Sequence, residues 1–278
     1  MDDRLRTPEP VLVLDLFDDE RAVLISLLSG LSAEEWERPT ACAGWSVKDV
    51  ALHILGGDLG NISRRRDGFA GTSPAPGEDL VTFLNRFNED WVAVTRRLST
   101  RLVVDLLKFS GPPLFDYLRS LDQIAVGGGV GWAGLDRAPV WLDVAREYTE
   151  RWLHQQHIRD AVGKPGLTER RFMGPVLAAF AFALPVAFLP AVQPPGTTVH
   201  MRITGEAGGD WSLVRNRESW VLYEGAAAHA RARVEMDQSL AWRLLTKGIS
   251  EEDAAPIIRF EGDRELGGHV LRAVAIIA

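Results

Sequence analysis

The chain is poor in cysteine, histidine and tyrosine, with one, six and three of these among its 278 residues. The single cysteine, Cys42, excludes a disulfide within the chain and favours a reducing compartment, so we expect a cytoplasmic protein. Cys42 itself is interpreted as a small buried hydrophobic residue, although it lies close in sequence to a candidate site described below. The N-terminal segment MDDRLRTPEP has no basic region followed by an apolar core, and we expect no signal peptide.

Positive charge is also in deficit. The chain has 31 Lys and Arg against 38 Asp and Glu, which gives a net charge of −7 and argues against general nucleic-acid binding. The run Arg64–Arg66 is interpreted as a solvated helix end, where basic residues suit the helix dipole. The glycine-rich segment Gly127–Gly134 lacks the Lys-Ser/Thr of a phosphate-binding loop, so it indicates no nucleotide site.

One uncharged stretch, Phe172 to Val192, is long enough to span a membrane. It contains Pro175, Pro185 and Pro190, however, and Pro185 is expected to kink or end a helix. We therefore interpret the stretch as a buried connection between two domains and predict no membrane partner.

Hydrophobic periodicity divides the chain into two regions. A period of 3.6 predicts five long helices in the first region: Val11–Leu31, Ser46–Arg66, Leu80–Leu98, Val103–Leu121 and Pro139–Val162. A period of 2 then predicts strands at Thr198–Thr204, Trp211–Arg215, Ser219–Glu224, Ala230–Met236 and Ile257–Glu261. Helices are predicted at Ser239–Lys247 and from Asp263 to about Ala273.

These elements predict an α+β protein of two domains. We expect a helical domain over residues 1–167, an apolar connecting helix over 168–195, and a smaller α+β domain over 196–278. Oligomeric state is not indicated by the sequence.

The strongest chemical signal is the segment YTERWLHQQHIRD, in which Glu150, His154 and His157 are spaced by four and three residues. These spacings place one carboxylate and two imidazoles on one helix face. A catalytic divalent metal needs about three such ligands and an open position. The alternative is a solvated Glu/His face of no special function.

His53 is the candidate ligand from a second helix. Ser46 and Asp49 predict that this helix starts at Ser46, which puts His53 in the second turn. Glycines cost about 1 kcal/mol each inside a helix, so Gly56, Gly57 and Gly60, which follow at short spacing, indicate close approach of another group. The alternative for His53 is an ordinary surface or packed histidine.

Two segments, Trp36–Ile54 (WERPTACAGWSVKDVALHI) and Thr149–Gly163 (TERWLHQQHIRDAVG), resemble the two signatures of the mycothiol-dependent maleylpyruvate isomerase family. The resemblance implies a DinB-like four-helix bundle with a metal, typically zinc, held by His53, Glu150 and His154. The family more often has Asp where this chain has His157. His157 is thus a fourth ligand, an outer partner of a ligand, or neither.

The C-terminal region resembles the sterol-carrier-like second domain of the same family through its AWRLLTKG, EGD and VAIIA segments. The resemblance to the family as a whole implies that mycothiol, a low-molecular-weight thiol, is the cosubstrate and that the substrate is a small electrophile. The reaction is then a cis–trans isomerisation of the maleylpyruvate type, or thiol S-transfer to another electrophile. Arg243 and Lys247 are candidate anchors for a dicarboxylate. A non-catalytic, metal-stabilised protein that binds an apolar small molecule is the alternative from another class.

Overall fold

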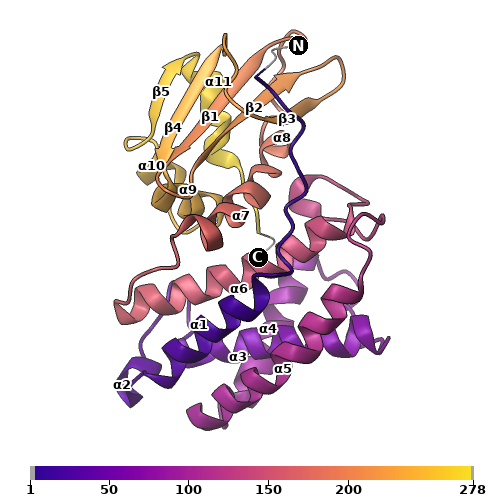
Figure 1. The fold of residues 1–278 in the computed structure, drawn as a ribbon, viewed down its shortest axis with the longest axis vertical. Coiled ribbons are helices and arrows are strands. Elements are labelled where there is room, and N and C mark those ends of the chain that lie inside the picture. The colour runs from indigo at the N-terminus through magenta and orange to yellow at the C-terminus, as the bar shows by residue number, and fades with distance from the viewer. Residues whose placement is uncertain (1–3, 277–278) are drawn as a thin grey trace. The chain divides into compact units, whose positions relative to one another are not determined.

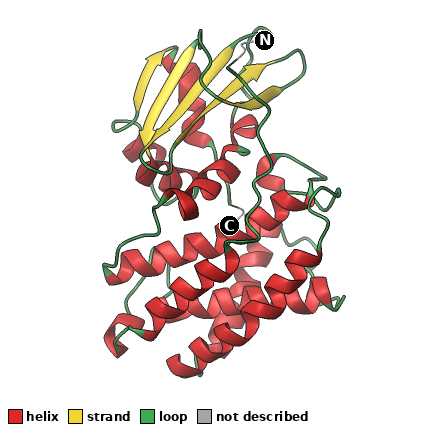
Figure 2. Ribbon diagram, in the orientation of Figure 1, coloured by secondary structure: helices red, strands yellow, loops and turns green. Residues whose placement is uncertain are grey.

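A computed structural model describes residues 4–276, which form two compact units (Figures 1 and 2). The helical unit comprises Val13–Asp122 and Glu147–Leu167. Of the described residues, the sheet unit comprises residues 4–12, Gln123–Arg146 and residues 168–276. The structure is α+β, as the sequence predicts, with a helical N-terminal region followed by a mixed five-stranded sheet.

The helical unit is built from long helices joined by short turns and one longer loop. Its elements are α1 (Phe17–Ser29), α2 (Ala33–Trp36), α3 (Val47–Asn61), a π-helical turn (Ile62–Arg66), α4 (Leu80–Thr95), α5 (Thr100–Ser120) and most of α6 (Val140–Val162). The predicted start of α3 is confirmed, because Ser46 Oγ accepts the Asp49 N–H while Asp49 accepts the Ser46 N–H. This capping box fixes the first turn of the helix that carries His53.

Apolar side chains from α1, α3, α4, α5 and α6 form the core of this unit. Representative members are Leu24, Leu55, Val92, Leu107 and Ile158, all with essentially no exposed surface. Burial of each such side chain stabilises the fold by roughly 1.5–3 kcal/mol relative to exposure. The core therefore fixes how the two helices with the candidate ligands, α3 and α6, lie against each other.

A cluster of ionised side chains also lies inside the helical unit. Asp58 of α3 accepts hydrogen bonds from Arg151 of α6 at 2.9 Å, Arg21 of α1 at 2.8 Å and Ser110 of α5 at 2.6 Å. Asp58 and Ser110 are fully buried and the two arginines nearly so. Both oxygens of the Asp58 carboxylate thus have partners, and one residue connects four helices.

The sheet unit contains five strands in the order β3-β2-β1-β4-β5. They are β1 (Thr198–Thr204), β2 (Gly209–Arg215), β3 (Trp220–Glu224), β4 (Ala232–Asp237) and β5 (Arg259–Gly262). β1 and β4 are parallel, and the other neighbouring pairs are antiparallel. The N-terminal segment also belongs here, because Arg6 pairs through its backbone with Glu224 of β3.

Short helices accompany the sheet. They are a 3₁₀ turn (Gly131–Ala133), α7 (Arg170–Ala181), α8 (Leu184–Ala187), α9 (Gln238–Leu245), α10 (Glu251–Ala254), α11 (Arg264–Gly268) and a second 3₁₀ turn (His269–Arg272). α9 packs against β1 and β4, and α11 packs against β4 and β5.

The apolar stretch predicted as one connecting helix forms two helices. α7 ends at Ala181, and Pro185 lies in the first turn of α8, where the missing N–H of a proline is tolerated. The segment Arg170–Ala187 is long and apolar enough to cross a membrane, but half of it is buried inside the protein, as in an ordinary core helix. This is weak evidence for a membrane span.

Candidate metal centre

Two helices bring His53, Glu150 and His154 together. His53 projects from α3, and Glu150 and His154 project from α6 one turn apart. Their potential ligand atoms all lie within 4.8 Å of one another. The imidazole rings of His53 and His154 meet edge to face with centroids 4.6 Å apart, and His154 Nε2 lies 3.6 Å from Glu150 Oε2. The three residues that the family resemblance implies as a ligand set are therefore neighbours in space.

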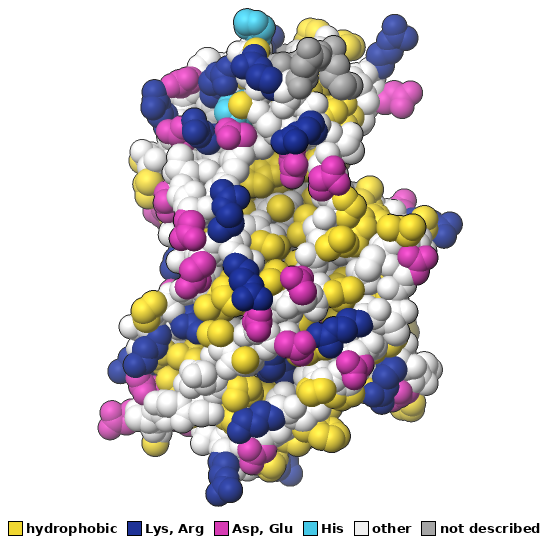
Figure 3. Space-filling view, viewed as in Figure 1, with side chains coloured by type: hydrophobic (Ala, Val, Ile, Leu, Met, Phe, Trp, Pro, Cys, Tyr) yellow, Lys and Arg dark blue, Asp and Glu magenta, His cyan; other side chains and the backbone are white. Residues whose placement is uncertain are grey.

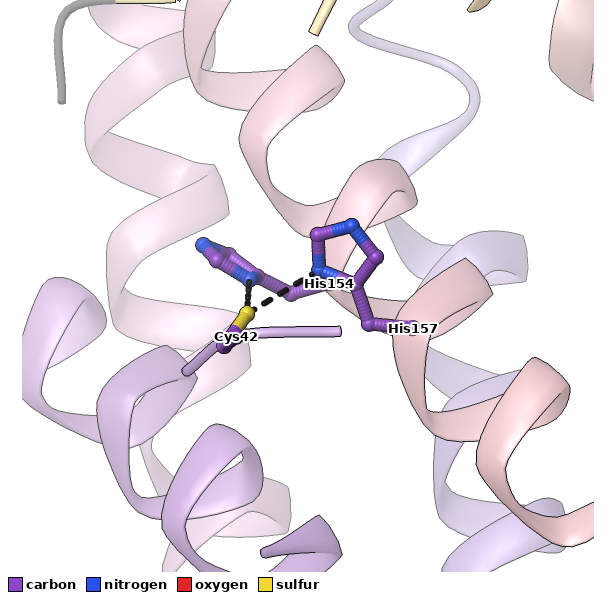
Figure 4. A group of neighbouring side chains, drawn as sticks. All are labelled: Cys42, His154 and His157. Atoms are coloured by element: carbon purple, nitrogen blue, oxygen red, sulfur yellow. Dashed lines mark hydrogen bonds between the residues drawn. The ribbon is translucent and has the colours of Figure 1, made fainter. Parts of the chain in front are cut away.

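Cys42 joins His154 and His157 in a second cluster. Cys42 Sγ lies 3.2 Å from His157 Nδ1 and 4.0 Å from His154 Nδ1, and both contacts are drawn as dashed lines in Figure 4. The ligand atoms of this cluster also lie within 4.8 Å of one another. His154 belongs to both clusters, whereas His157 belongs only to the cluster with Cys42.

The sequence predicts no chemical role for Cys42 beyond its closeness to the site. Its only signal was its position four residues ahead of the Ser46 cap of α3. A spacing rule for one helix cannot place this residue, because Cys42 comes from a turn closed by the Pro39–Ser46 bridge. The half-buried side chain faces two histidines, so the prediction of a plain hydrophobic role does not describe its surroundings.

The indole ring of Trp45 borders the first cluster, which consists of His53, Glu150 and His154. The Trp45 ring lies 5.1 Å from the His53 ring, and its indole N–H donates to Glu89 Oε2 of α4 at 2.7 Å. Glu89 also accepts from Arg96 at 3.0 Å, so the partner of Trp45 is itself held in place. The Trp45 ring therefore limits the positions open to the His53 ring and excludes water from one side of it.

Electrostatics favours metal binding by His53. Burial and, next, the nearby His154 lower the pKa of His53 to about 3, so its imidazole is neutral at pH 7 and keeps a lone pair. For His154, burial lowers the pKa, but hydrogen bonds with Cys42 and Glu150 outweigh burial and raise it to about 9. For Cys42, burial raises the pKa, but hydrogen bonds with His154 and His157 bring it to about 6.

The first cluster fits a divalent transition metal. Metal–ligand bonds of about 2.0–2.2 Å in a tetrahedral site place donor atoms roughly 3.5 Å apart, so small side-chain adjustments within the 4.8 Å spread are enough. Two imidazoles and one carboxylate are a donor set used by catalytic zinc sites with an open position. The Glu150 side chain is 37% exposed and the His154 side chain 13%, so the cluster is accessible from the Glu150 side.

The glycines that follow His53 in α3 have different surroundings in the structure. A Cβ on Gly56 would lie 2.6 Å from Trp91 Cδ1 and Nε1, so the group that approaches closely is the Trp91 indole of α4. A Cβ on Gly57, one turn after His53, would meet nothing within 4 Å. The predicted close approach is therefore seen at Gly56 as packing, while Gly57 leaves free space.

Arg243, the predicted substrate anchor, lies on α9 of the sheet unit. Its guanidinium stacks over the Trp242 ring at 4.2 Å and donates to the Ser239 carbonyl at 3.3 Å. Lys247, which follows α9, has a positive φ of 60°. A role for Arg243 in substrate binding stays a prediction.

Residues 17–159 match the family described as Mycothiol maleylpyruvate isomerase N-terminal domain. Among solved structures, the chain is similar to the crystal structure of the mycothiol-dependent maleylpyruvate isomerase and to that of a histidine-to-alanine mutant. Each is 12% identical in sequence with a TM-score of 0.49, and the match covers 83% of this chain and 86% of the other. No curated protein matches the chain.

Proposed function

Since the chain belongs to the mycothiol maleylpyruvate isomerase family through its N-terminal domain, we propose that it is a metal-dependent enzyme that uses a low-molecular-weight thiol. The observation that carries the proposal is the meeting of His53, Glu150 and His154 from two helices. The proposed metal is zinc and the proposed thiol is mycothiol. The proposed substrate is a small electrophile, and the proposed setting is the cytoplasm.

Zinc in this donor set supplies a positive charge that stabilises a thiolate at neutral pH, where a free thiol with a pKa of about 8.5 is mostly protonated. His53 and His154 contribute imidazole nitrogens, and Glu150 contributes a carboxylate from the more exposed side. Trp45 keeps the His53 ring in place and keeps water from its face. The buried Asp58–Arg151 pair holds α3 and α6 at the separation that brings the donors together.

The proposed reaction is a cis–trans isomerisation of the maleylpyruvate type. The thiolate sulfur forms a bond to one carbon of the cis double bond, and the π electrons move toward the conjugated carbonyl. Rotation about the resulting single bond, followed by cleavage of the same carbon–sulfur bond, returns the thiolate and gives the trans isomer. With an electrophile that carries a leaving group, the same attack gives thiol S-transfer, which is the second candidate reaction.

A dicarboxylate substrate needs a cation, and Arg243 is the proposed anchor. Arg243→Ala is expected to raise KM for a dicarboxylate while the metal content stays unchanged. The proposal includes no nucleic-acid or membrane partner. In support, acidic and basic side chains are interspersed over the face of the molecule in Figure 3, and the net charge is −7.

The test begins with metal content. Protein purified without chelator is expected to contain about one zinc per chain, since the described residues bring one Glu/His/His set together. His53→Ala and His154→Ala are expected to lose it. His229→Ala, which removes an exposed histidine of the sheet unit, is the matched control and should retain it. Full zinc content in both His53→Ala and His154→Ala would show that the ligand assignment is wrong.

Activity separates the candidate reactions. Maleylpyruvate and chlorodinitrobenzene, each with mycothiol, distinguish isomerase from transferase. Either activity should vanish on chelation, return with zinc and require added thiol. If the zinc-loaded protein turns over neither compound and instead binds an apolar ligand, the non-catalytic alternative is the correct one.

A further inference from the structure

Cys42 lies between the Nδ1 atoms of two histidines. Its Sγ is 3.2 Å from His157 Nδ1 and 4.0 Å from His154 Nδ1 (Figure 4). The Cys42 sulfur has no role in the proposed reaction, because the reacting thiol belongs to the cosubstrate. The chain has no second cysteine with which Cys42 can pair.

The backbone around Cys42 is fixed by hydrogen bonds. The Cys42 N–H donates to Thr40 Oγ1 at 3.2 Å, and the Cys42 carbonyl accepts the Trp45 N–H at 3.0 Å. Thr40 Oγ1 in turn donates to the Trp45 carbonyl at 2.9 Å, and Pro39 bridges to Ser46 at the start of α3. With its backbone held and one side-chain torsion, Cys42 can place its sulfur at few positions. The contact with the two histidines is therefore built into the turn.

The two nitrogens of His154 face different groups. Nε2 lies 3.6 Å from Glu150 Oε2, whereas Nδ1 lies 4.0 Å from Cys42 Sγ. An imidazole binds a metal through a nitrogen lone pair, and the partner of the other nitrogen decides which one carries the proton. When a metal displaces one proton of the His154 ring, a hydrogen-bond acceptor at Nδ1 keeps the other proton there and leaves the lone pair on Nε2, the nitrogen beside Glu150.

We propose that Cys42 is a positioning residue of the metal centre: its Sγ accepts the Nδ1–H of His154 and so holds the tautomer in which Nε2, the nitrogen beside Glu150, is left to bind the metal. His157 orients the sulfur, because its Nδ1 lies 3.2 Å from Cys42 Sγ. The proposal rests on the metal-binding part of the proposed function. It adds a residue outside the ligand set that decides which His154 nitrogen binds.

The competing arrangement uses Cys42 as a direct ligand together with His154 and His157, whose ligand atoms also lie within 4.8 Å of one another. His154 would then bind through Nδ1, the nitrogen that faces Cys42. Its Nε2, the nitrogen beside Glu150, would then not bind the same ion. The two arrangements therefore differ in the bound nitrogen of His154 and in whether sulfur is a ligand.

Cobalt(II) and zinc are the probes. Because Cys42 is the only cysteine, a sulfur-to-cobalt charge-transfer band without added thiol would report Cys42 alone. We expect no such band in the wild-type protein. In zinc-loaded protein, long-range ¹H–¹⁵N NMR of the histidine rings is expected to show His154 bound through Nε2 with its proton on Nδ1.

Substitution tests the role directly. Cys42→Ala is expected to lower zinc affinity about 10- to 100-fold, the usual effect of removing the partner of a ligating histidine, and to mix the His154 ring forms. Cys42→Ser should recover part of the loss, because its hydroxyl can accept the same hydrogen. Ala43→Ser changes an exposed neighbour in the same turn and should leave affinity and ring form unchanged.

A charge-transfer band that disappears in Cys42→Ala would overturn the proposal in favour of direct ligation. Unchanged zinc affinity and an unchanged His154 ring form in Cys42→Ala would also overturn it. If wild-type protein binds no zinc, the metal site of the proposed function fails as well, and this result is distinguishable because it precedes any substitution.

Discussion

Arg151 Nη2 lies 2.9 Å from Asp58 Oδ1 inside the helical unit, and this contact ties α6 to α3 beside the candidate metal centre. Arg151 directly follows Glu150 in the chain, and Asp58 lies five residues after His53. The ion pair thus fixes the relative position of the two helices close to the donors.

We predict that Asp58→Asn destabilises the protein by about 3–5 kcal/mol, because it removes the charge shared by two buried arginines. The matched control is Asp67→Asn, which removes an exposed acid paired with Arg66 and should change stability by only about 0.5 kcal/mol. Urea denaturation measures the free energy of unfolding of both variants. Equal, small losses in the two variants would contradict a central role for Asp58.

The same pair predicts acid sensitivity. Burial raises the pKa of Asp58, but Arg21 and Arg151 together outweigh burial, so its pKa is lowered. The stabilisation from Asp58 is therefore fully present above the unfolded-state pKa of about 3.9 and is lost as pH falls through the lower folded-state pKa. The difference in unfolding free energy between wild type and Asp58→Asn should shrink below about pH 4. A difference that is constant from pH 7 to pH 3 would contradict this.

Two adjacent glycines of α3 are predicted to respond in opposite directions. Gly57→Ala meets nothing within 4 Å and should stabilise the helix by up to about 1 kcal/mol. Gly56→Ala would force the Trp91 indole away from the Leu52 carbonyl, to which it donates at 2.8 Å, and should cost about 1–3 kcal/mol. Urea denaturation gives the sign of the stability change in each variant. A change of the same sign in both would show that the space around one of the two glycines is misassigned.

Zinc is predicted to stabilise the helical unit as a cross-link between α3 and α6. At a free zinc concentration of 100 times Kd, the gain in unfolding free energy should be about 2.7 kcal/mol. Thermal unfolding with and without zinc measures it. His53→Ala should abolish the gain and His229→Ala should keep it, whereas an equal gain in His53→Ala would place the zinc elsewhere.

His157→Asp is predicted to keep the metal and to change its affinity by about 10- to 100-fold at most, because His157 Nδ1 lies against Cys42 Sγ and His157 is not part of the group of His53, Glu150 and His154. Equilibrium dialysis with zinc provides the measurement. Complete loss of zinc in this variant would make His157 a direct ligand.

Much of the candidate site follows from local spacing. Glu150 and His154 lie one turn apart because α6 forms as predicted, and His53 lies where the Ser46 cap puts it. β1 spans the predicted residues Thr198–Thr204, because alternation of apolar and polar residues is a strictly local signal.

Features that depend on distant partners could not be predicted. The predicted helix Val11–Leu31 is shorter in the structure, where α1 starts at Phe17 and the residues up to Leu12 belong with the sheet unit. Likewise, the place of Cys42 against His154 and His157 requires a turn and a helix separated by more than a hundred residues. No periodic pattern in one segment contains that information.

The interleaving of the two units along the chain limits how this protein can be dissected. Residues up to Leu12 and Gln123–Arg146 belong to the sheet unit, although the helical unit surrounds the second segment in sequence. A fragment ending at Leu167 would retain Arg6 but lose Glu224, with which Arg6 pairs through its backbone. Such a fragment would expose orphaned backbone groups and apolar side chains such as Trp132 and Trp141, and we expect it to aggregate even if every donor residue is present. Functional studies of this chain therefore call for point substitutions in the full-length protein rather than truncation.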